Sequence, residues 1–250
     1  MTQSAAERYL RLGLQLGRHV DGIVDAYYGP PELAAVVDAE PPVDPRALAA
    51  DAEELLDELE DGWLRDQVGG LRTYAGVLAG ESGSYADEVE GCYGVRPTYT
   101  DAAVFTAAHE RLEELLPGDG PLAERYERWE NSIRVPTEQL EPTMAVVIEE
   151  ARAWTRGLVE LPAGEGVVLE IVRDKAWWAD CHYLGDLRSR ISVNVDLPMS
   201  ALELLRITMH ETYPGHHAEA SSKEHLLVRG RGLLEETLPV LFPAPPDAVE

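Results

Sequence analysis

The sequence predicts a mainly α-helical protein with a small β element near residues 165–196. Apolar residues recur at intervals of three and four along most of the chain, which is the period of an amphipathic helix. The pattern changes at 167–173 and 190–195, where short runs rich in β-branched residues indicate strands. With 250 residues, 45% of them apolar, the chain is long enough to bury a substantial core.

Residues 1–160 are expected to form a helical region. Between residues 4 and 24 apolar side chains repeat at helical spacing, and Ser4 is placed to cap the first turn. The GPPEL segment at 29–33 is predicted to be a turn that restarts a helix, because proline is favourable in a first helical turn. Further helices, separated by Gly and Pro, are predicted near 46–60, 62–80, 100–116, 121–133 and 137–159.

Residues 161–250 are expected to continue the same domain with the strands and a metal-binding motif. The two β-branched runs are predicted strands that could pair with each other. The segment between them, DKAWWADCHYLGDLRS, has no period and is interpreted as a loop or the wall of a cleft.

The charge balance is strongly acidic, with 46 Asp and Glu residues against 21 Lys and Arg and a formal net charge of −25. Such a surface repels phosphate backbones and anionic lipid, so we expect neither nucleic acid nor a membrane as a partner. Nearly all the positive charge is Arg, which resembles halophilic proteins of a salt-rich cytoplasm, where salt screens the repulsion. Two cysteines and a charged N-terminal segment are also typical of a cytoplasmic protein.

The segment MSALELLRITMHETYPGHHAEA, which starts at residue 199, combines a helix start, three histidines and a helix break. Ser200 and Glu203 have the spacing of a capping box, which predicts that a helix begins there. Leu202, Leu205 and Met209 are predicted to face the core on one stripe of this helix. The first histidine then falls in its third turn.

Pro214 and Gly215 predict that this helix does not continue straight. In a straight helix, His216 would lie about 120° around the axis and roughly 9 Å along it from His210. Two histidine nitrogens on one tetrahedral zinc ion lie only ~3.4 Å apart, so a straight helix could not place both on the metal. Pro214 lacks an N–H for the carbonyl of His210, and Gly215 permits a turn with positive φ. The break is predicted to fold His216 back toward His210.

Three histidines around a helix break predict metal binding. His210 and His216 are the candidate ligands, and Glu211, next to the first of them, is the candidate general base. His217 could be a ligand, a supporting hydrogen-bond partner or an exposed neighbour, and we favour the supporting role. The His-Glu pair at 109–110 has no such break after it and is interpreted as a solvated helix face.

The motifs YYGPPEL, YLGDLRSRISVNVD and HETYPGHH together resemble the DUF885 family, whose members are grouped with helical zinc metallopeptidases. The resemblance implies a helical zincin-like fold with Zn²⁺ held by His210 and His216 and with Glu211 as base. It also implies a third ligand from a later Glu in an E-G-W-A-like motif; this is expected to be Glu250, a residue just before it or one beyond it. An Ala-Glu pair stands where the family usually has Leu-Gln, and the family's large C-terminal helical part is missing.

These motifs predict a zinc-dependent metallopeptidase acting on a peptide or another small-molecule substrate. In this chemistry the metal polarises the scissile carbonyl and acidifies a water molecule, and a carboxylate moves the proton to the leaving amine. The strand at 190–195 resembles the edge strand that aligns extended substrates in such enzymes, and Asn194 and Tyr213 are the expected substrate-binding residues. Two alternatives stay open: a metal-dependent hydrolase of a non-peptide amide or ester, and a non-catalytic helical relative or fragment with an incomplete site.

Overall fold

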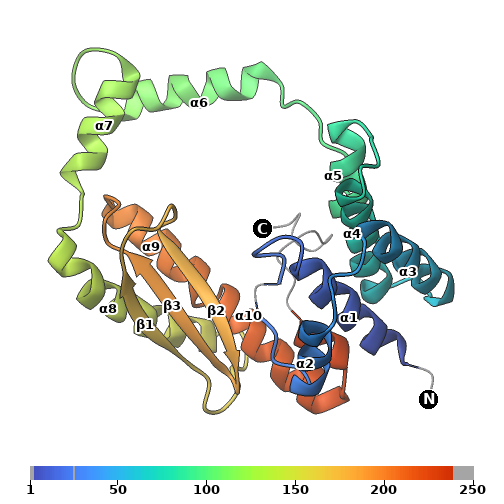
Figure 1. The fold of residues 1–250 in the computed structure, drawn as a ribbon. Helices are drawn as coiled ribbons and strands as arrows, with labels where there is room; N and C mark the ends of the chain where they lie inside the picture. Colours follow the sequence, from blue (N-terminus) through green and yellow to red (C-terminus); the bar gives the residue numbers. More distant parts are fainter. Residues whose placement is uncertain (1–2, 25, 239–250) are drawn as a thin grey trace. The chain divides into compact units, whose positions relative to one another are not determined.

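A computed structural model describes residues 3–24 and 26–238 of the chain (Figure 1). The chain divides into two compact units, Met1–Pro97 together with Lys223–Glu250, and Thr98–Ser222. The second unit is therefore inserted into the first, whereas the sequence suggested a change of character near residue 160. None of the helices in the described ranges is both long and apolar enough to cross a membrane.

The first unit is helical, and its first two helices begin at the predicted signals. Ser4 caps α1 in a capping box with Glu7, and Pro31 stands in the first turn of α2. The helix α5 was not expected from the sequence. The elements are α1 (Ala5–Gly17), α2 (Pro31–Ala39), α3 (Pro45–Glu58), α4 (Trp63–Leu78), α5 (Tyr85–Tyr93), the π-helical turn η1 (Glu224–Arg229) and the 3-10 turn η2 (Leu234–Thr237).

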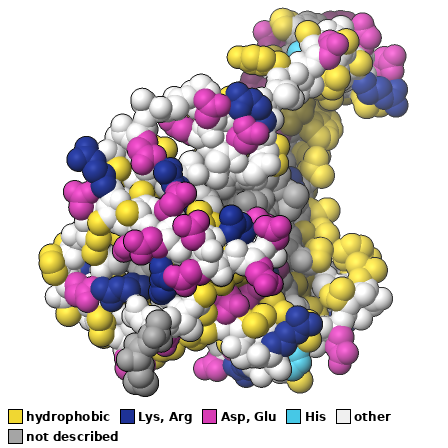
Figure 2. All heavy atoms as spheres, turned by 90° about the vertical axis from the view of Figure 1, so that its right-hand side faces the viewer, with side chains coloured by type: hydrophobic (Ala, Val, Ile, Leu, Met, Phe, Trp, Pro, Cys, Tyr) yellow, Lys and Arg dark blue, Asp and Glu magenta, His cyan; other side chains and the backbone are white. Residues whose placement is uncertain are grey.

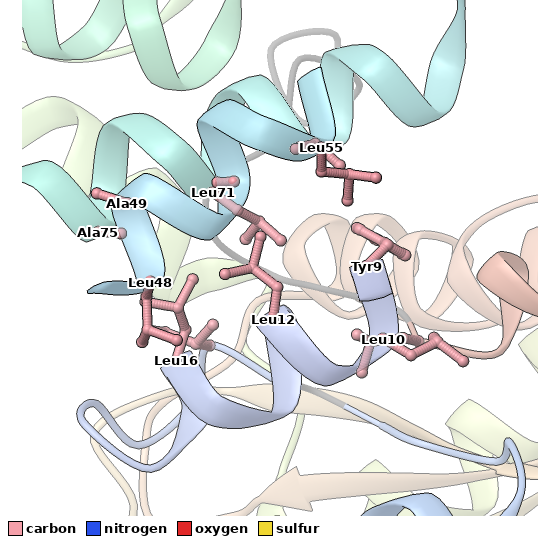
Figure 3. Packing of buried hydrophobic residues seen from close by; sticks show 13 residues of the cluster. Tyr9, Leu10, Leu12, Leu16, Leu48, Ala49, Leu55, Leu71 and Ala75 are labelled. Atoms are coloured by element: carbon pink, nitrogen blue, oxygen red, sulfur yellow. The ribbon is translucent and has the colours of Figure 1, made fainter. Parts of the chain in front are cut away.

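Helices α1, α3 and α4 enclose the core of the first unit (Figure 3). Leu10 and Leu16 of α1 are fully buried, together with Leu48 of α3 and Leu71 of α4. Burying side chains of this size contributes about 1.5–3 kcal/mol each. The helical period seen in these segments of the sequence therefore corresponds to a packed face.

The second unit contains all the strands found in the described residues. Its predicted helices near 100–116, 121–133 and 137–159 are confirmed, and so are the two predicted strands. The elements are α6 (Ala102–Leu115), α7 (Leu122–Ser132), α8 (Thr137–Arg156), β1 (Gly166–Val172), β2 (Ala179–Gly185), β3 (Arg188–Asn194), α9 (Ala201–Glu211) and α10 (His216–Lys223).

The three strands form one sheet in the order β1-β3-β2, with β1 parallel and β2 antiparallel to β3. The central strand is therefore β3, with a neighbour on each side. The expectation that the strand at 190–195 is an open edge for substrate is wrong. The edge strands of this sheet are β1 and β2.

The interpretation of the segment between the predicted strands as an aperiodic loop is also wrong, because β2 occupies much of it. The first four residues of β2 are all half-buried, so the strand lacks the alternation that would reveal it in the sequence. The turn to β3 places Asp186 and Leu187 at φ of 52° and 60°. Two successive residues with positive φ are typical of a two-residue hairpin, but neither residue here is the usual glycine.

Helices α8 and α9 pack on the face of the sheet presented by Ile191 of β3 (Figure 1). Leu140 and Met144 of α8 and Leu204 of α9 contribute to the same core. Ser189 lies on this face as well, because alternate residues of a strand share a face. It is buried, and it stands at the end of the sheet where the chain enters β3.

Candidate metal centre

The site is built where α9 gives way to α10. Ser200 caps α9 by accepting a hydrogen bond from the N–H of Glu203 at 3.2 Å, while the Glu203 carboxylate pairs with Arg206 at 2.5 Å. The helix ends at Glu211, and α10 begins at His216. The predicted break at Pro-Gly is therefore confirmed.

The buried face of α9 differs from the predicted one. Leu204 and Thr208 are buried, whereas Leu202 and Leu205 are 57% and 44% exposed. The prediction failed because it followed apolar residues alone. The polar Thr208 can be buried since its hydroxyl donates to the carbonyl of Leu204 at 2.6 Å. This inner stripe continues to Glu211, which is also buried.

Gly215 is required by a close approach of the backbone. A Cβ atom at this position would lie 1.8 Å from the carbonyl oxygen of His210 and 2.6 Å from that of Met209. The N–H of Gly215 donates to the same Met209 carbonyl at 3.2 Å. The expectation of a positive φ at Gly215 is wrong, because its φ is not in that region. It is the missing side chain that lets the turn fold back onto the end of α9.

The turn brings His210 and His216 together. Their Nε2 atoms lie 3.1 Å apart, and their ring centroids are 4.5 Å apart with the planes at 79°. Glu211 belongs to the same group, in which the possible ligand atoms all lie within 4.8 Å of one another. The prediction that the break folds His216 back toward His210 is thus confirmed.

The two histidines and the carboxylate differ in their access to solvent. His210 is exposed and His216 is half-buried, whereas Glu211 is only 8% exposed. A metal ion or a substrate can approach the histidines from solvent while the carboxylate is presented from the protein side. Accessible nitrogen ligands beside a sheltered carboxylate suit a hydrolytic centre, which needs an open position on its metal.

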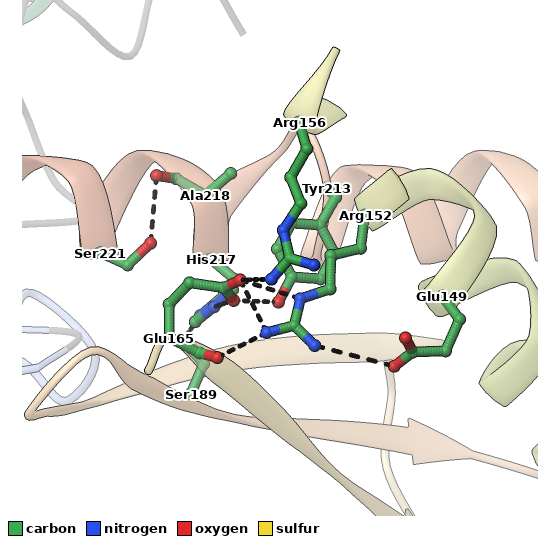
Figure 4. Close-up of polar contacts among 9 residues, drawn as sticks. All are labelled: Glu149, Arg152, Arg156, Glu165, Ser189, Tyr213, His217, Ala218 and Ser221. Atoms are coloured by element: carbon green, nitrogen blue, oxygen red, sulfur yellow. Dashed lines mark hydrogen bonds and ion pairs between the residues drawn. The ribbon is translucent and has the colours of Figure 1, made fainter. Parts of the chain in front are cut away.

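His217 is fully buried, in contrast to His216 beside it. Its Nδ1 lies 2.7 Å from the hydroxyl oxygen of Ser189, and its Nε2 lies 3.2 Å from Oε2 of Glu165 (Figure 4). Both ring nitrogens are occupied, so neither is left for a metal ion. Of the three roles considered for His217, this position fits the supporting hydrogen-bond role.

Glu165, in the loop just before β1, is the central residue of this network, and sequence reasoning missed it. Its carboxylate has no solvent-exposed area. Oε2 accepts from the Tyr213 hydroxyl and from His217, and Oε1 accepts from Arg152 at 2.8 Å and Arg156 at 3.2 Å (Figure 4). The sequence offers only a weak signal for this, a single acidic residue between two glycines at the start of a predicted strand.

Burial alone would raise the pKa of Glu165, but hydrogen bonds from Tyr213, Arg152 and His217 outweigh it and bring that pKa below its usual value. For His217, burial lowers the pKa by more than the neighbouring carboxylate raises it. Glu165 is therefore ionised and His217 neutral at neutral pH. In this state His217 donates its Nε2–H to Glu165 and accepts the Ser189 hydroxyl at Nδ1.

The two expected substrate contacts, Tyr213 and Asn194, are both fully buried. The Tyr213 hydroxyl donates to Glu165, and the Asn194 amide donates to backbone carbonyls of the loop before β2 at 2.8 and 3.1 Å. Both residues thus belong to the framework that supports the turn and this loop. Glu250, the expected third ligand, lies outside the described residues.

Comparisons with protein-family models, with curated proteins and with solved structures found no match to this chain. The resemblance to the DUF885 family therefore stays a prediction carried by the motifs. The geometry of the His210, Glu211 and His216 group stands independently of it.

Proposed function

We propose that this protein is a zinc-dependent hydrolase, with peptide bonds as the first candidate substrate. The observation that carries the proposal is the 3.1 Å separation of the Nε2 atoms of His210 and His216, with Glu211 in the same group. Two histidine nitrogens on tetrahedral zinc lie ~3.4 Å apart, so the pair needs only a small adjustment to share an ion.

His210 and His216 would hold the ion. When bound, zinc would supply a Lewis acid that polarises a carbonyl group and makes a water molecule more acidic. Hydrolytic zinc sites use three protein ligands, so these two histidines need one more. Glu250, a residue just before it or one beyond it stays the predicted source of that ligand, as the resemblance implies.

Glu211 is the proposed general base. It follows His210 directly in α9, and one of its carboxylate oxygens lies within 4.8 Å of one ring nitrogen of each histidine. From this position it can take a proton from an attacking water molecule and pass it to the leaving amine. Its burial at the end of α9 keeps the carboxylate beside the reacting groups rather than in bulk solvent.

An extended peptide is favoured as substrate by the neighbouring sheet. β2 is an edge strand, antiparallel to β3, and it contacts α9, the helix that carries His210 and Glu211. An extended chain can add to a sheet alongside an edge strand through main-chain hydrogen bonds. We therefore propose β2, in place of β3, as the strand that aligns the substrate.

A second candidate function is a non-catalytic metal site in which Glu211 is itself the third ligand. The observation that favours it is the inclusion of the Glu211 carboxylate in the same 4.8 Å group as the two histidine nitrogens. A carboxylate used as a ligand would not be available as a base. The two functions therefore make opposite predictions for the same substitution.

The substitution Glu211→Gln separates the two candidates. If Glu211 is the base, the variant should retain zinc and lose hydrolysis by roughly 10²–10⁴-fold, since an amide cannot take up the proton. Zinc affinity would be measured by competition with a chromophoric chelator. Turnover would be measured on fluorogenic peptide, amide and ester panels. His210→Ala and His216→Ala should each abolish zinc binding.

The His-Glu pair of α6 supplies matched controls. His109 and Glu110 have the same order in the sequence and are both exposed, so His109→Ala and Glu110→Gln should change neither zinc affinity nor turnover. Loss of zinc from Glu211→Gln would assign Glu211 as a ligand. Unchanged turnover in that variant would remove it as the base, and a wild-type protein that binds no zinc would contradict the proposal as a whole.

A further inference from the structure

One carboxylate oxygen contacts both sides of the turn between α9 and α10. Oε2 of Glu165 accepts the hydroxyl of Tyr213 and lies 3.2 Å from Nε2 of His217 (Figure 4). Tyr213 directly precedes the Pro214-Gly215 pair, and His217 follows it after one intervening residue. That intervening residue is His216, the candidate ligand.

The carboxylate is itself held in place from α8. Arg152 donates from Nε to Oε1 of Glu165 at 2.8 Å and from a second nitrogen to the Glu165 backbone carbonyl at 2.8 Å. Its guanidinium carbon also lies 5.9 Å from the centre of the Tyr213 ring. On the other side, Ser189 of β3 contacts Nδ1 of His217 at 2.7 Å. The turn is thus tied to α8, to the start of β1 and to β3.

We propose that Glu165 is a positioning residue for the metal centre: it fixes Tyr213 and His217, and so holds His216 against His210 before any ion binds. The part of this inference that concerns metal binding rests on the proposed function. The part that concerns the order of the turn does not. His216 and His217 are consecutive in a helix, so their side chains point about 100° apart. Anchoring the buried ring of His217 therefore sets the direction in which His216 points. A turn that is already ordered binds an ion more tightly, because less conformational entropy is lost on binding.

Tyr213→Phe tests the inference with the smallest change. It removes one donor to Glu165 and keeps the buried ring, so the fold should survive. Zinc affinity, measured with the metal alone in competition with a chelator, should fall by about 10–100-fold, as is typical when the support of a ligand is lost. The absorption spectrum of the Co²⁺-loaded variant should show a changed ligand geometry.

A second measurement needs no metal. Amide hydrogen exchange in residues 212–219 of the metal-free variant should become on the order of tenfold faster, because a hydrogen bond to a charged group has been removed. Exchange in α8 should stay unchanged. If the Glu165→Gln variant folds, it should show a larger loss of zinc affinity and faster amide exchange in the turn than Tyr213→Phe. If it does not fold, the measurements on Tyr213→Phe alone test the inference.

Ser221→Ala is the matched control. Ser221 is also buried in α10, and its hydroxyl donates to the Ala218 carbonyl at 3.3 Å without contact to Glu165, so neither zinc affinity nor exchange in the turn should change. Zinc affinity and turn exchange in Tyr213→Phe that both equal wild type would overturn the inference. If wild type binds no zinc, the proposed function fails, and hydrogen exchange alone decides whether Glu165 holds the turn.

Discussion

Glycine is needed at position 215 because of a close contact with the backbone, and not because of a positive φ. The carbonyl oxygens of His210 and Met209 occupy the space that a side chain would need. The same contact closes the turn, since the Gly215 N–H donates to the Met209 carbonyl at 3.2 Å. The approach of His216 to His210 therefore depends on the absence of one carbon atom.

Gly215→Ala should open the turn. A Cβ atom 1.8 Å from the His210 carbonyl cannot be accommodated, so the turn must shift; overpacking of this kind costs about 1–3 kcal/mol or more. We expect a lower free energy of unfolding in urea and loss of zinc binding. Gly69→Ala in α4 is the control, because nothing lies within 4 Å of its added carbon and alanine favours helix by about 1 kcal/mol. A Gly215→Ala protein that binds zinc like wild type would contradict this account.

At this residue scale the sequence predicted the histidine group and a supporting role for His217, but it missed Glu165, which the inner residues contact. His210, Glu211 and His216 stand within seven positions, so local spacing and the chemistry of Pro-Gly were sufficient to relate them. Glu165 is 52 positions from His217, and it is one of 46 acidic residues in the chain. No periodicity relates two such positions, because their contact depends on how β1, α8 and α10 pack.

At the scale of elements, most of the helices were predictable and the arrangement of the strands was not. Helical period survives in a single sequence where one face of a helix packs on a core, as it does in α1, α3 and α4. The sheet contains β2, whose burial does not alternate, and its turn lacks the usual glycine, so both local signals of a hairpin were absent. Strand order depends on packing between distant segments, so β3 could not be recognised as central from its own residues.

Two leucines of α9 test the orientation of that helix. Leu204 is 1% exposed and Leu205 is 44% exposed, although they are neighbours with the same side chain. Leu204→Ala should lower the free energy of unfolding by about 2–5 kcal/mol, because it leaves a cavity against the sheet. Leu205→Ala should change it by less than about 1 kcal/mol. Urea denaturation of both variants gives the comparison. If Leu205→Ala lowered the free energy of unfolding more than Leu204→Ala, the buried face of α9 predicted from the sequence would be the correct one.

At the scale of the whole molecule, acidic side chains far outnumber basic ones. They are scattered over the face drawn in Figure 2, interspersed with Arg and Lys side chains. Some are paired, as Arg96 is with Asp87 and Glu90 at 3.0 and 2.5 Å. Such exposed pairs contribute little, about 0–1 kcal/mol each. With 46 acidic and 21 basic residues, repulsion between acidic side chains exceeds the attraction between opposite charges.

Added salt should therefore stabilise the protein. Raising the ionic strength from 0.1 to 1 M shortens the Debye length from about 10 Å to about 3 Å, which screens attraction and repulsion alike. Because repulsion is in excess, the melting temperature should rise with KCl, by about 2–4 °C for each kcal/mol of relieved repulsion. Melts in sucrose at matched osmolality control for effects unrelated to charge. A flat or falling melting temperature would remove the interpretation as a halophilic protein.

The insertion of one unit into the other sets an order of events during synthesis. Tyr28 donates from its N–H to the Thr237 carbonyl at 3.1 Å and from its hydroxyl to the Glu236 carbonyl at 2.7 Å. Leu238 is buried in the same cluster as α1, α3 and α4. At ribosomal rates of about 5–20 residues per second, this segment emerges about 7 to 28 seconds after residue 97. Part of the apolar surface of the N-terminal helices therefore stays uncovered while the entire second unit is translated.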